Sequence, residues 1–330
     1  MIHSVFKLVR YKNLIFIVAI QWLMAACVIA PTLAMFHVPV HTTWWMQLIL
    51  VAATTLIAAG GYVVNDYFDL KIDRINRPDK VIVGNNIDKR NAMRLYQILT
   101  IAGVVLGLAA AVVLRSWTVG MIFVIVPGML WFYSASYKRQ FLVGNLIVAL
   151  SAALVPLIPF IVECGLLTDN YNFLIRETPI LKTLYAWGCT FAAFAFLWTL
   201  IREIVKDLQD EYGDREMECR TVPIICGALW TKIIITTLVL LADGLLAYLI
   251  TTKLAIPGDT STTFRYFLVG IAMPGLCLIA ILWSKTCAAY RNASALCKFI
   301  MVIGVLYAVV YHFLIAKAFG LPFLGIFHII

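Results

Sequence analysis

Nine apolar runs constrain the fold of this chain more than any other feature of its sequence. A helix that spans a bilayer needs about 20 mostly apolar residues. The segments that reach or approach this length are 14–36, 44–64, 95–114, 117–134, 141–161, 183–201, 229–250, 266–284 and 299–317. Because lipid offers the backbone no hydrogen-bond partner, each run is predicted to be a helix. The expected fold class is therefore all-α, a polytopic membrane protein with nine transmembrane helices.

The composition of the 330 residues agrees with a membrane location. Hydrophobic residues make up 63% of the chain and charged residues only 13%, and a water-soluble protein of this composition would have no place for its apolar surface. The formal net charge of +9 does not indicate nucleic acid, because the basic residues form no stripe that could follow a phosphate backbone. The cysteines show no C-x-x-C spacing and the histidines no metal-ligand spacing. Neither a nucleic acid nor a haem is expected as a partner.

The basic residues orient the predicted helices. If the N-terminus lies inside, the outer side holds six of the 26 basic residues, namely Arg115, Arg176, Lys182, Lys253, Arg265 and Lys317. The other 20 basic residues then lie inside. The positive-inside rule therefore places the N-terminus in the cytoplasm and, with nine spans, the C-terminus outside. We expect the protein in the inner or plasma membrane.

Acidic residues gather in two stretches of the chain, 65–94 and 202–228, which follow the second and sixth apolar runs. Together these stretches hold 12 of the 17 acidic residues. Both lie on the side that is predicted to be cytoplasmic. We expect them to form two Asp-rich loops that carry the chemistry of the protein.

The first cluster runs from Asn65 to Asp73. A spacing of four residues places Asn65, Asp69 and Asp73 on one face of a helix that continues from the second run. Asp66 falls beside this face. An ordinary solvated loop would not require such a helical spacing directly after an apolar run.

The second cluster, residues 207–214, repeats the pattern. Spacings of three and four place Asp207, Asp210 and Asp214 on one helical face. Like charges at these spacings repel each other, and a divalent cation is the simplest way to offset the repulsion. Magnesium takes oxygen ligands and completes its shell with water and phosphate oxygens. The clusters therefore predict a Mg²⁺ site with the ligands Asn65, Asp66, Asp69, Asp73, Asp207, Asp210 and Asp214.

Basic residues flank both clusters. Cations together with a metal ion neutralise the charge that develops on a departing diphosphate. Each of these residues, taken singly, also fits the positive-inside rule. The residues predicted to bind the diphosphate are Arg77 and Lys80 after the first cluster, Arg202 and Lys206 before the second, and Arg220 after it.

These motifs resemble those of the UbiA superfamily of intramembrane prenyltransferases. Residues 65–73 match the family's N-D-x-x-D-x-x-x-D, residues 73–80 match its D-x-x-I-N-R-P-x-[KR] extension, and residues 210–214 match its second D-x-x-x-D. The nine spans and the positions of the motifs agree as well, so the resemblance covers the whole chain. It implies a single prenyltransferase domain over residues 1–330, with helices around a central apolar cavity for the prenyl tail.

The resemblance also implies a Mg²⁺-dependent mechanism. An allylic diphosphate is expected on the metal between the two motifs, where Asp69, Asp73, Asp210 and Asp214 are the implied catalytic residues. Lys138 joins the cations that are expected on the diphosphate. Withdrawal of charge weakens the C1–O bond of the donor, and an acceptor nucleophile then attacks C1.

Finer features favour one acceptor. Residues 202–207, 213–214 and 220–224, and the segments 133–139 and 144–146, look like the archaeal-type enzymes that geranylgeranylate geranylgeranylglyceryl phosphate. This likeness implies a polyprenyl diphosphate donor, a lipid acceptor and an ether product. The aromatic prenyltransferases of quinone biosynthesis, which act on 4-hydroxybenzoate-type acids, stay an alternative with an aromatic acceptor.

Two other membrane functions fit the sequence less well. A cation-coupled transporter usually carries its acidic residues near the bilayer midplane, whereas here they cluster at one predicted face. A CDP-alcohol phosphotransferase would carry the motif D-G-x-x-A-R, which this sequence lacks. Asp243 lies inside the seventh apolar run but is displaced toward the outer side, so we expect a role in helix packing or at an interface.

Overall fold

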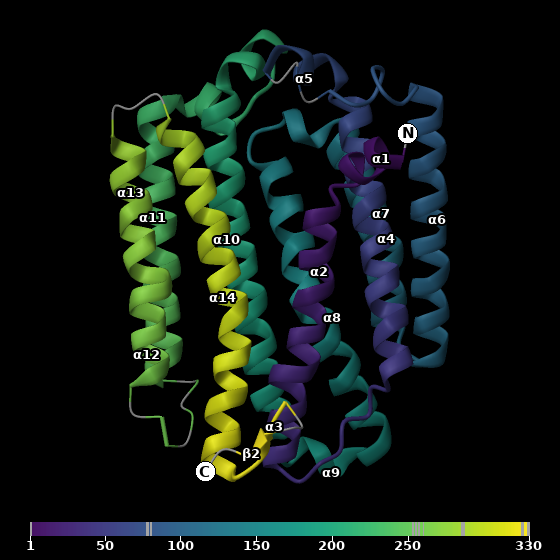
Figure 1. Ribbon diagram of the computed structural model, residues 1–330, viewed down its shortest axis with the longest axis vertical. Coiled ribbons are helices and arrows are strands. Elements are labelled where there is room, and N and C mark those ends of the chain that lie inside the picture. Colours follow the sequence, from purple (N-terminus) through teal and green to yellow (C-terminus); the bar gives the residue numbers. More distant parts are fainter. Residues whose placement is uncertain are drawn as a thin grey trace. The chain divides into compact units, whose positions relative to one another are not determined.

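The structure is a computed structural model that describes residues 2–76, 79, 81–252, 254, 256, 258–259, 261–284, 288–324 and 327–328. Nine helices in this described part are long and apolar enough to cross a membrane. Six of them are α4 (Trp44–Phe68), α6 (Lys89–Val113), α7 (Trp117–Ala135), α8 (Val143–Tyr171), α10 (Ile180–Glu216) and α14 (Ala289–Phe319). The predicted all-α membrane fold with nine spans is confirmed (Figure 1).

The other three spans contain an irregularity. The first is α2 (Tyr11–Leu23), the π-helix η1 (Met24–Ile29) and α3 (Ala30–Met35) in succession. The eighth combines α12 (Thr262–Phe267), the π-helix η4 (Leu268–Ala272) and α13 (Met273–Trp283). The seventh, α11 (Val222–Thr252), is interrupted at Gly227, whose φ of 80° and ψ of 158° are not helical. Glycine adopts this conformation at no steric cost, and the predicted run 229–250 begins just after the break.

Several helices extend well beyond the apolar runs that predicted them. The stretch 202–228 was expected to be a loop, but residues 202–216 are the end of α10 and residues 222–228 belong to α11. The prediction of a loop was wrong because backbone hydrogen bonding continues a helix past the point where its side chains become polar. Short elements complete the fold: α1 (Ile2–Leu8), α5 (Leu70–Asn76), η3 (Tyr137–Arg139), α9 (Phe173–Arg176) and the antiparallel pair β1 (Pro322–Phe323) and β2 (Phe327–His328).

The chain forms two compact units, each assembled from separate segments. Unit 1 comprises residues 1–19, 44–151 and 210–227, and unit 2 comprises residues 20–43, 152–209 and 228–330. The first Asp-rich cluster and the residues Asp210 and Asp214 of the second therefore belong to the same unit. A single functional domain over residues 1–330 stays a prediction.

In unit 1, α4 packs closely against α6 and α7, which run side by side in Figure 1. Small residues allow this approach, as is usual between helices in membranes. A Cβ added at Gly103 of α6 would lie 3.1 Å from the Ala53 carbonyl oxygen of α4, and one added at Gly107 would lie 2.3 Å from the Phe123 ring of α7. These contacts hold the middle of α4 close to α6, and α6 close to α7.

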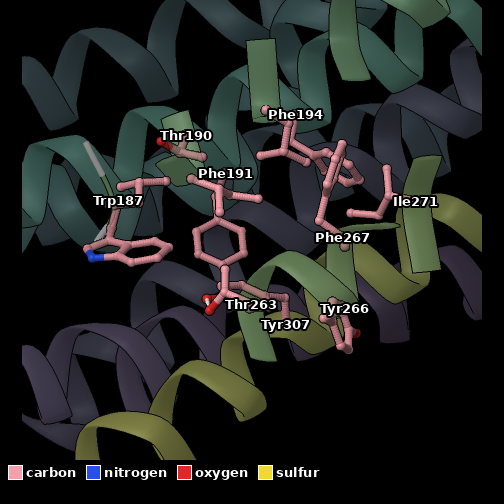
Figure 2. A pocket seen from close by; sticks show the side chains of 13 residues that line it. Trp187, Thr190, Phe191, Phe194, Thr263, Tyr266, Phe267, Ile271 and Tyr307 are labelled. Carbon is pink, nitrogen blue, oxygen red and sulfur yellow. Dashed lines mark hydrogen bonds between the residues drawn. The ribbon is translucent and has the colours of Figure 1, made fainter. Parts of the chain in front are cut away.

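In unit 2, α14 packs against α13, η4, η1 and α3. Figure 2 shows an apolar pocket that α10, α11, α12 and α14 line. Its aromatic side chains, among them Trp187, Phe191 and Tyr307, come from α10, α12 and α14. A Cβ at Gly304 would lie 2.2 Å from the Phe194 ring, so this glycine makes room for the ring. The predicted central cavity among all nine spans stays a prediction, distinct from this pocket within unit 2.

Candidate active site

The first cluster lies where α4 passes into α5. Asn65 and Asp66 belong to the last turn of α4, Asp69 lies between the two helices and Asp73 is in α5. The N–H of Asp69 donates to the carbonyl of Asn65 (2.9 Å), and the N–H of Asp73 donates to the carbonyl of Asp69 (2.8 Å). Helical hydrogen bonding therefore continues through the cluster, which confirms that Asn65, Asp69 and Asp73 share one face.

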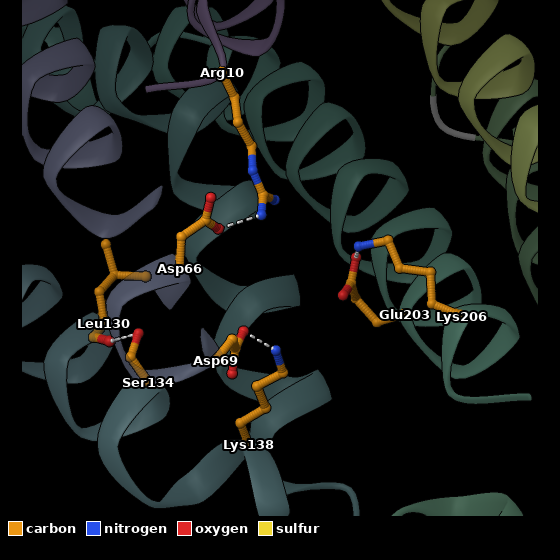
Figure 3. A network of polar contacts seen from close by, with 8 residues as sticks. All are labelled: Arg10, Asp66, Asp69, Leu130, Ser134, Lys138, Glu203 and Lys206. Atoms are coloured by element: carbon orange, nitrogen blue, oxygen red, sulfur yellow. Dashed lines mark hydrogen bonds and ion pairs between the residues drawn. The ribbon is translucent and has the colours of Figure 1, made fainter. Parts of the chain in front are cut away.

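Two cations from distant parts of the sequence pair with this cluster, as Figure 3 shows. The Lys138 ammonium of η3 donates to the carboxylate of Asp69, which is buried. The Arg10 guanidinium, between α1 and α2, pairs with Asp66 at 2.8 Å between Nη2 and Oδ1. Each cation offsets the repulsion that closely spaced carboxylates would otherwise produce.

The charges around the cluster shift the protonation of its members. Burial, the nearby carboxylate of Asp69 and that of Asp66 raise the pKa of Asp73 to about 6, although Lys138 and Arg10 oppose the shift. Burial by itself would lower the pKa of the Lys138 ammonium, but the adjacent Asp69 carboxylate outweighs it and the net pKa is raised. Lys138 is therefore charged at neutral pH. The closely spaced carboxylates of the cluster favour the binding of further cations.

The second cluster reaches the first through a loop in unit 1. Asp207, Asp210 and Asp214 all lie in α10, as their helical spacing predicts. The N–H of Cys219 donates to the carbonyl of Asp214 (2.9 Å), and the next N–H, that of Arg220, donates to the carbonyl of Arg139 (2.8 Å). Since Arg139 follows Lys138 in η3, the loop after α10 is tied to the turn that carries the partner of Asp69.

Carboxylates of both clusters shift the pKa of the Cys219 thiol. Burial and the carboxylate of Asp214 raise the pKa of this thiol, Arg139 and Lys138 lower it, and Asp69 raises it further. A charge acts measurably on a pKa only over a short distance in a protein. The carboxylates of Asp69 and Asp214 therefore both act on the protonation of one buried thiol.

The donor atoms suit a hard cation such as Mg²⁺, which prefers oxygen ligands. The Oδ1 atom of Asn65 is buried and has no hydrogen-bond partner among the described residues, so it is available as a neutral oxygen ligand. In the described part of the chain, however, no three His, Cys, Asp or Glu side chains gather as a ready-made metal site. Asp66 and Asp69 are instead paired with Arg10 and Lys138, and the assignment of the metal ligands stays a prediction.

The predicted diphosphate-binding residues fall into three groups. Arg202 and Lys206 lie in the part of α10 that belongs to unit 2, where both pair with Glu203 at 2.9 Å and 2.6 Å. Lys138 and Arg220 belong to unit 1, in the turn and the loop described above. Arg77 and Lys80 lie outside the described residues. Of these cations, Lys138 is seen paired with a cluster carboxylate, that of Asp69.

Comparison with known proteins decides the family. The sequence profile of the UbiA prenyltransferase family matches residues 23–303. The chain belongs to this family. As a UbiA prenyltransferase it is an integral membrane enzyme that transfers prenyl groups, as its motifs predicted. The digeranylgeranylglyceryl phosphate synthase of Methanosphaera stadtmanae is 30% identical over 210 residues, which cover 62% of this chain and 68% of the relative. Among the matching synthases, the stretch that matches covers between 51% and 68% of the relative's length.

Solved structures show the same fold. A digeranylgeranylglyceryl phosphate synthase matches 94% of this chain and 98% of its own at a TM-score of 0.63 and 24% identity. A UbiA homologue from Archaeoglobus fulgidus bound to DMAPP and Mg²⁺ matches 91% of this chain and 97% of its own at a TM-score of 0.52 and 14% identity. Because the sequence identities are this low, the comparison with solved structures supports only the fold of this UbiA prenyltransferase.

Prediction from sequence missed three residues that interact with predicted site residues of this UbiA prenyltransferase. Arg10 looked like an ordinary positive-inside residue, because nothing local relates it to Asp66, which lies 56 positions away. Cys219 looked like a small buried hydrophobe, and only the fold places it near both clusters. Glu203 had a usable signal, because its spacing of three from Lys206 is that of a helical ion pair.

Proposed function

We propose that this UbiA prenyltransferase transfers a geranylgeranyl group from its diphosphate to the hydroxyl of geranylgeranylglyceryl phosphate and forms an ether, with Mg²⁺ as cofactor. The observation that carries the proposal is the tie between the two clusters, through Lys138 on Asp69 and Arg220 on Arg139. A diphosphate needs cations on both of its phosphoryl groups. The synthase relatives and the homologue bound to DMAPP and Mg²⁺ support this choice of donor, acceptor and metal.

The metal would be held by oxygen ligands from both clusters. We assign this task to Asn65, whose buried Oδ1 has no partner among the described residues, and to Asp69, Asp73, Asp210 and Asp214. Asp207 is assigned a supporting role. When bound, Mg²⁺ supplies Lewis-acid stabilisation of the charge that develops on the diphosphate.

Lys138 has the position of a residue that serves both the free and the loaded site. Without substrate, its ammonium neutralises Asp69. With a diphosphate present, its three N–H donors can contact phosphate oxygens as well. As the C1–O bond breaks, the electron pair leaves on the diphosphate oxygen, where this cation stabilises it. The acceptor hydroxyl then attacks C1 to form the ether, and its proton passes to the released diphosphate.

The remaining predicted cations are proposed to complete the neutralisation of the diphosphate. These residues are Arg77, Lys80, Arg202, Lys206 and Arg220. We also propose that the clusters face the cytoplasm in the inner or plasma membrane, because the excess of basic residues lies on that side of the predicted topology. Both substrates would then enter from the cytoplasmic leaflet.

An acceptor screen tests the proposal. The purified protein in lipid nanodiscs would receive labelled geranylgeranyl diphosphate, Mg²⁺ and either geranylgeranylglyceryl phosphate or 4-hydroxybenzoate. We expect labelled, acid-stable ether on the glyceryl phosphate and stoichiometric release of diphosphate, both abolished by a chelator. Exclusive labelling of the aromatic acid would establish the alternative acceptor, and no release of diphosphate with either acceptor would refute prenyl transfer.

A further inference from the structure

Arg10 meets the first cluster from the far end of the sequence. Its Nη2 lies 2.8 Å from Oδ1 of Asp66, and its guanidinium carbon lies 5.0 Å from the centre of the Tyr62 ring. The side-chain amide of Asn13 donates to the Tyr62 hydroxyl (3.3 Å). Planar guanidinium groups stack on aromatic faces in this way. Arg10 is therefore held in one place by two different contacts.

The backbone at Arg10 is arranged to deliver this side chain. Its φ of 53° lies in the left-handed region, which is costly for a residue with a Cβ. The preceding residues Leu8 and Val9 are buried in a cluster with Val63 of α4 and Ala92 of α6. This anchor keeps the strained turn against the end of α4.

Most N–H donors of the Arg10 guanidinium have no acceptor among the described residues. Arginine carries five N–H donors in a rigid fork, and the hydrogen bond to Asp66 is the one found for Arg10 among the described residues. The side chain is 41% exposed, against 18% for Asp66. The open donors match the oxygens of a phosphate, which arginine binds in a bidentate manner.

Arg10 lies beside the face that serves the metal, rather than on it. Asn65, Asp69 and Asp73 follow one another at intervals of four, whereas Asp66 is one residue, or about 100°, further round the helix. Lys138 is placed on the metal face through Asp69. A second anion close to a bound diphosphate requires a cation of its own, and the ion pair of Arg10 is with Asp66, outside that face.

We infer that Arg10, positioned by Asp66 and Tyr62, binds the phosphate of the acceptor while Lys138 serves the diphosphate of the donor. This inference rests on the proposed function for the identity of the acceptor as a prenylated glyceryl phosphate. It makes Asp66 a positioning residue for Arg10 instead of a metal ligand. The acceptor hydroxyl is then presented to C1 of the donor from the side of the N-terminal segment.

The test compares Arg10→Gln, Arg10→Lys and wild type in nanodiscs. Native mass spectrometry would measure the equilibrium binding of three ligands: geranylgeranylglyceryl phosphate, dephosphorylated geranylgeranylglycerol and geranylgeranyl diphosphate. Where turnover occurs, KM would be measured for each substrate. Lys12→Gln is the matched control, because Lys12 is an exposed cation two residues from Arg10. We expect Arg10→Gln to weaken binding of the phosphorylated acceptor by about 10- to 100-fold, as for loss of a charged hydrogen bond. The dissociation constants of the other two ligands should stay within twofold of wild type. Arg10→Lys should lie between, and Lys12→Gln should match wild type.

The outcomes separate this inference from the proposed function. Unchanged binding of the phosphorylated acceptor in Arg10→Gln, or an equal loss for the dephosphorylated lipid, overturns the role of Arg10 even if wild type makes the ether. A selective loss of the phosphorylated lipid supports the role even if wild-type turnover shows a different preferred acceptor. An equal loss for donor and acceptor would also overturn it, because Arg10 would then act on the metal site through Asp66.

Discussion

The ammonium of Lys138 donates a hydrogen bond to the carboxylate of Asp69, and so joins the turn η3 to the first Asp-rich cluster. The carboxylate is buried, and its partner comes from a segment 69 residues later in the chain. An unpaired buried charge is costly, so each of the two residues depends on the other. In the proposed reaction the same lysine also faces the departing diphosphate.

Replacing Lys138 by Gln should therefore impair the chemical step. Loss of one group that stabilises transition-state charge typically lowers kcat about 10²- to 10³-fold, and we expect a loss of this size with geranylgeranyl diphosphate. Lys182→Gln, at an exposed position of α10, should retain wild-type kcat. Steady-state kinetics, together with size-exclusion profiles that confirm folding, provide the measurement. A wild-type kcat in Lys138→Gln would show that the lysine only pairs with Asp69.

The packing of unit 1 predicts that Gly103→Val destabilises the protein. A Cβ at this position would lie 2.7 Å from Ile57 and 3.1 Å from the Ala53 carbonyl, so α6 would have to move away from α4. Overpacking of this kind costs about 1–3 kcal/mol. Thermal unfolding in detergent should show a lower Tm than wild type. Gly128→Val is the matched control, because a Cβ there meets no atom within 4 Å; an equal Tm loss in both variants would contradict the packing argument.

Asp243 and Gly275 should be energetically coupled. A Cβ at Gly275 of α13 would lie 2.8 Å from Oδ2 of Asp243 in α11, which agrees with the packing role expected for this aspartate. Gly275→Ala should therefore lower the free energy of unfolding by about 1–3 kcal/mol. The loss should be smaller in an Asp243→Ala background, where the obstructing carboxylate is gone. A double-mutant cycle measures this difference, and simple additivity would show that the two side chains do not interact.

The capping of α12 predicts a pH-dependent contribution to stability. The carboxylate of Asp259 accepts hydrogen bonds from the backbone N–H groups of Ser261, Thr262 and Thr263. Partial burial would raise its pKa, but the bonds from Thr263 and Thr262 outweigh it and hold the pKa below the ordinary value of 3.8. Because the folded-state pKa is lowered, the stabilisation is fully present above pH 3.8 and is lost as the pH falls through the folded-state value.

Asp259→Ala should therefore cost about 1 kcal/mol at pH 7, a typical figure for loss of a helix cap. The difference from wild type should shrink as unfolding is measured at pH values falling from 4 toward 3. Asp169→Ala, at an exposed position in α8, is the control and should show no such trend. A penalty for Asp259→Ala that stays constant down to pH 3 would rule out the carboxylate as the cap.

Features of short sequence range were predictable, and those of long range were not. The common face of Asn65, Asp69 and Asp73 follows from the helical period alone, and the hydrogen bonds through the cluster confirm it. The pairing of Glu203 with Lys206 has the same local origin and could have been anticipated. The contact of Arg10 with Asp66 depends on a strained turn and on the burial of Leu8 and Val9, neither of which leaves a periodic signal in the sequence.

The break at Gly227 has a consequence for how this chain can change. If α11 were a continuous helix, the direction of every side chain in the seventh span would depend on the residues at the start of the helix. One residue inserted there would then rotate the whole span about its axis by about 100°. The non-helical backbone at Gly227 separates these two registers. Residues can therefore be inserted, deleted or substituted within 222–226, during evolution or design, while the surface that the span presents to lipid stays the same.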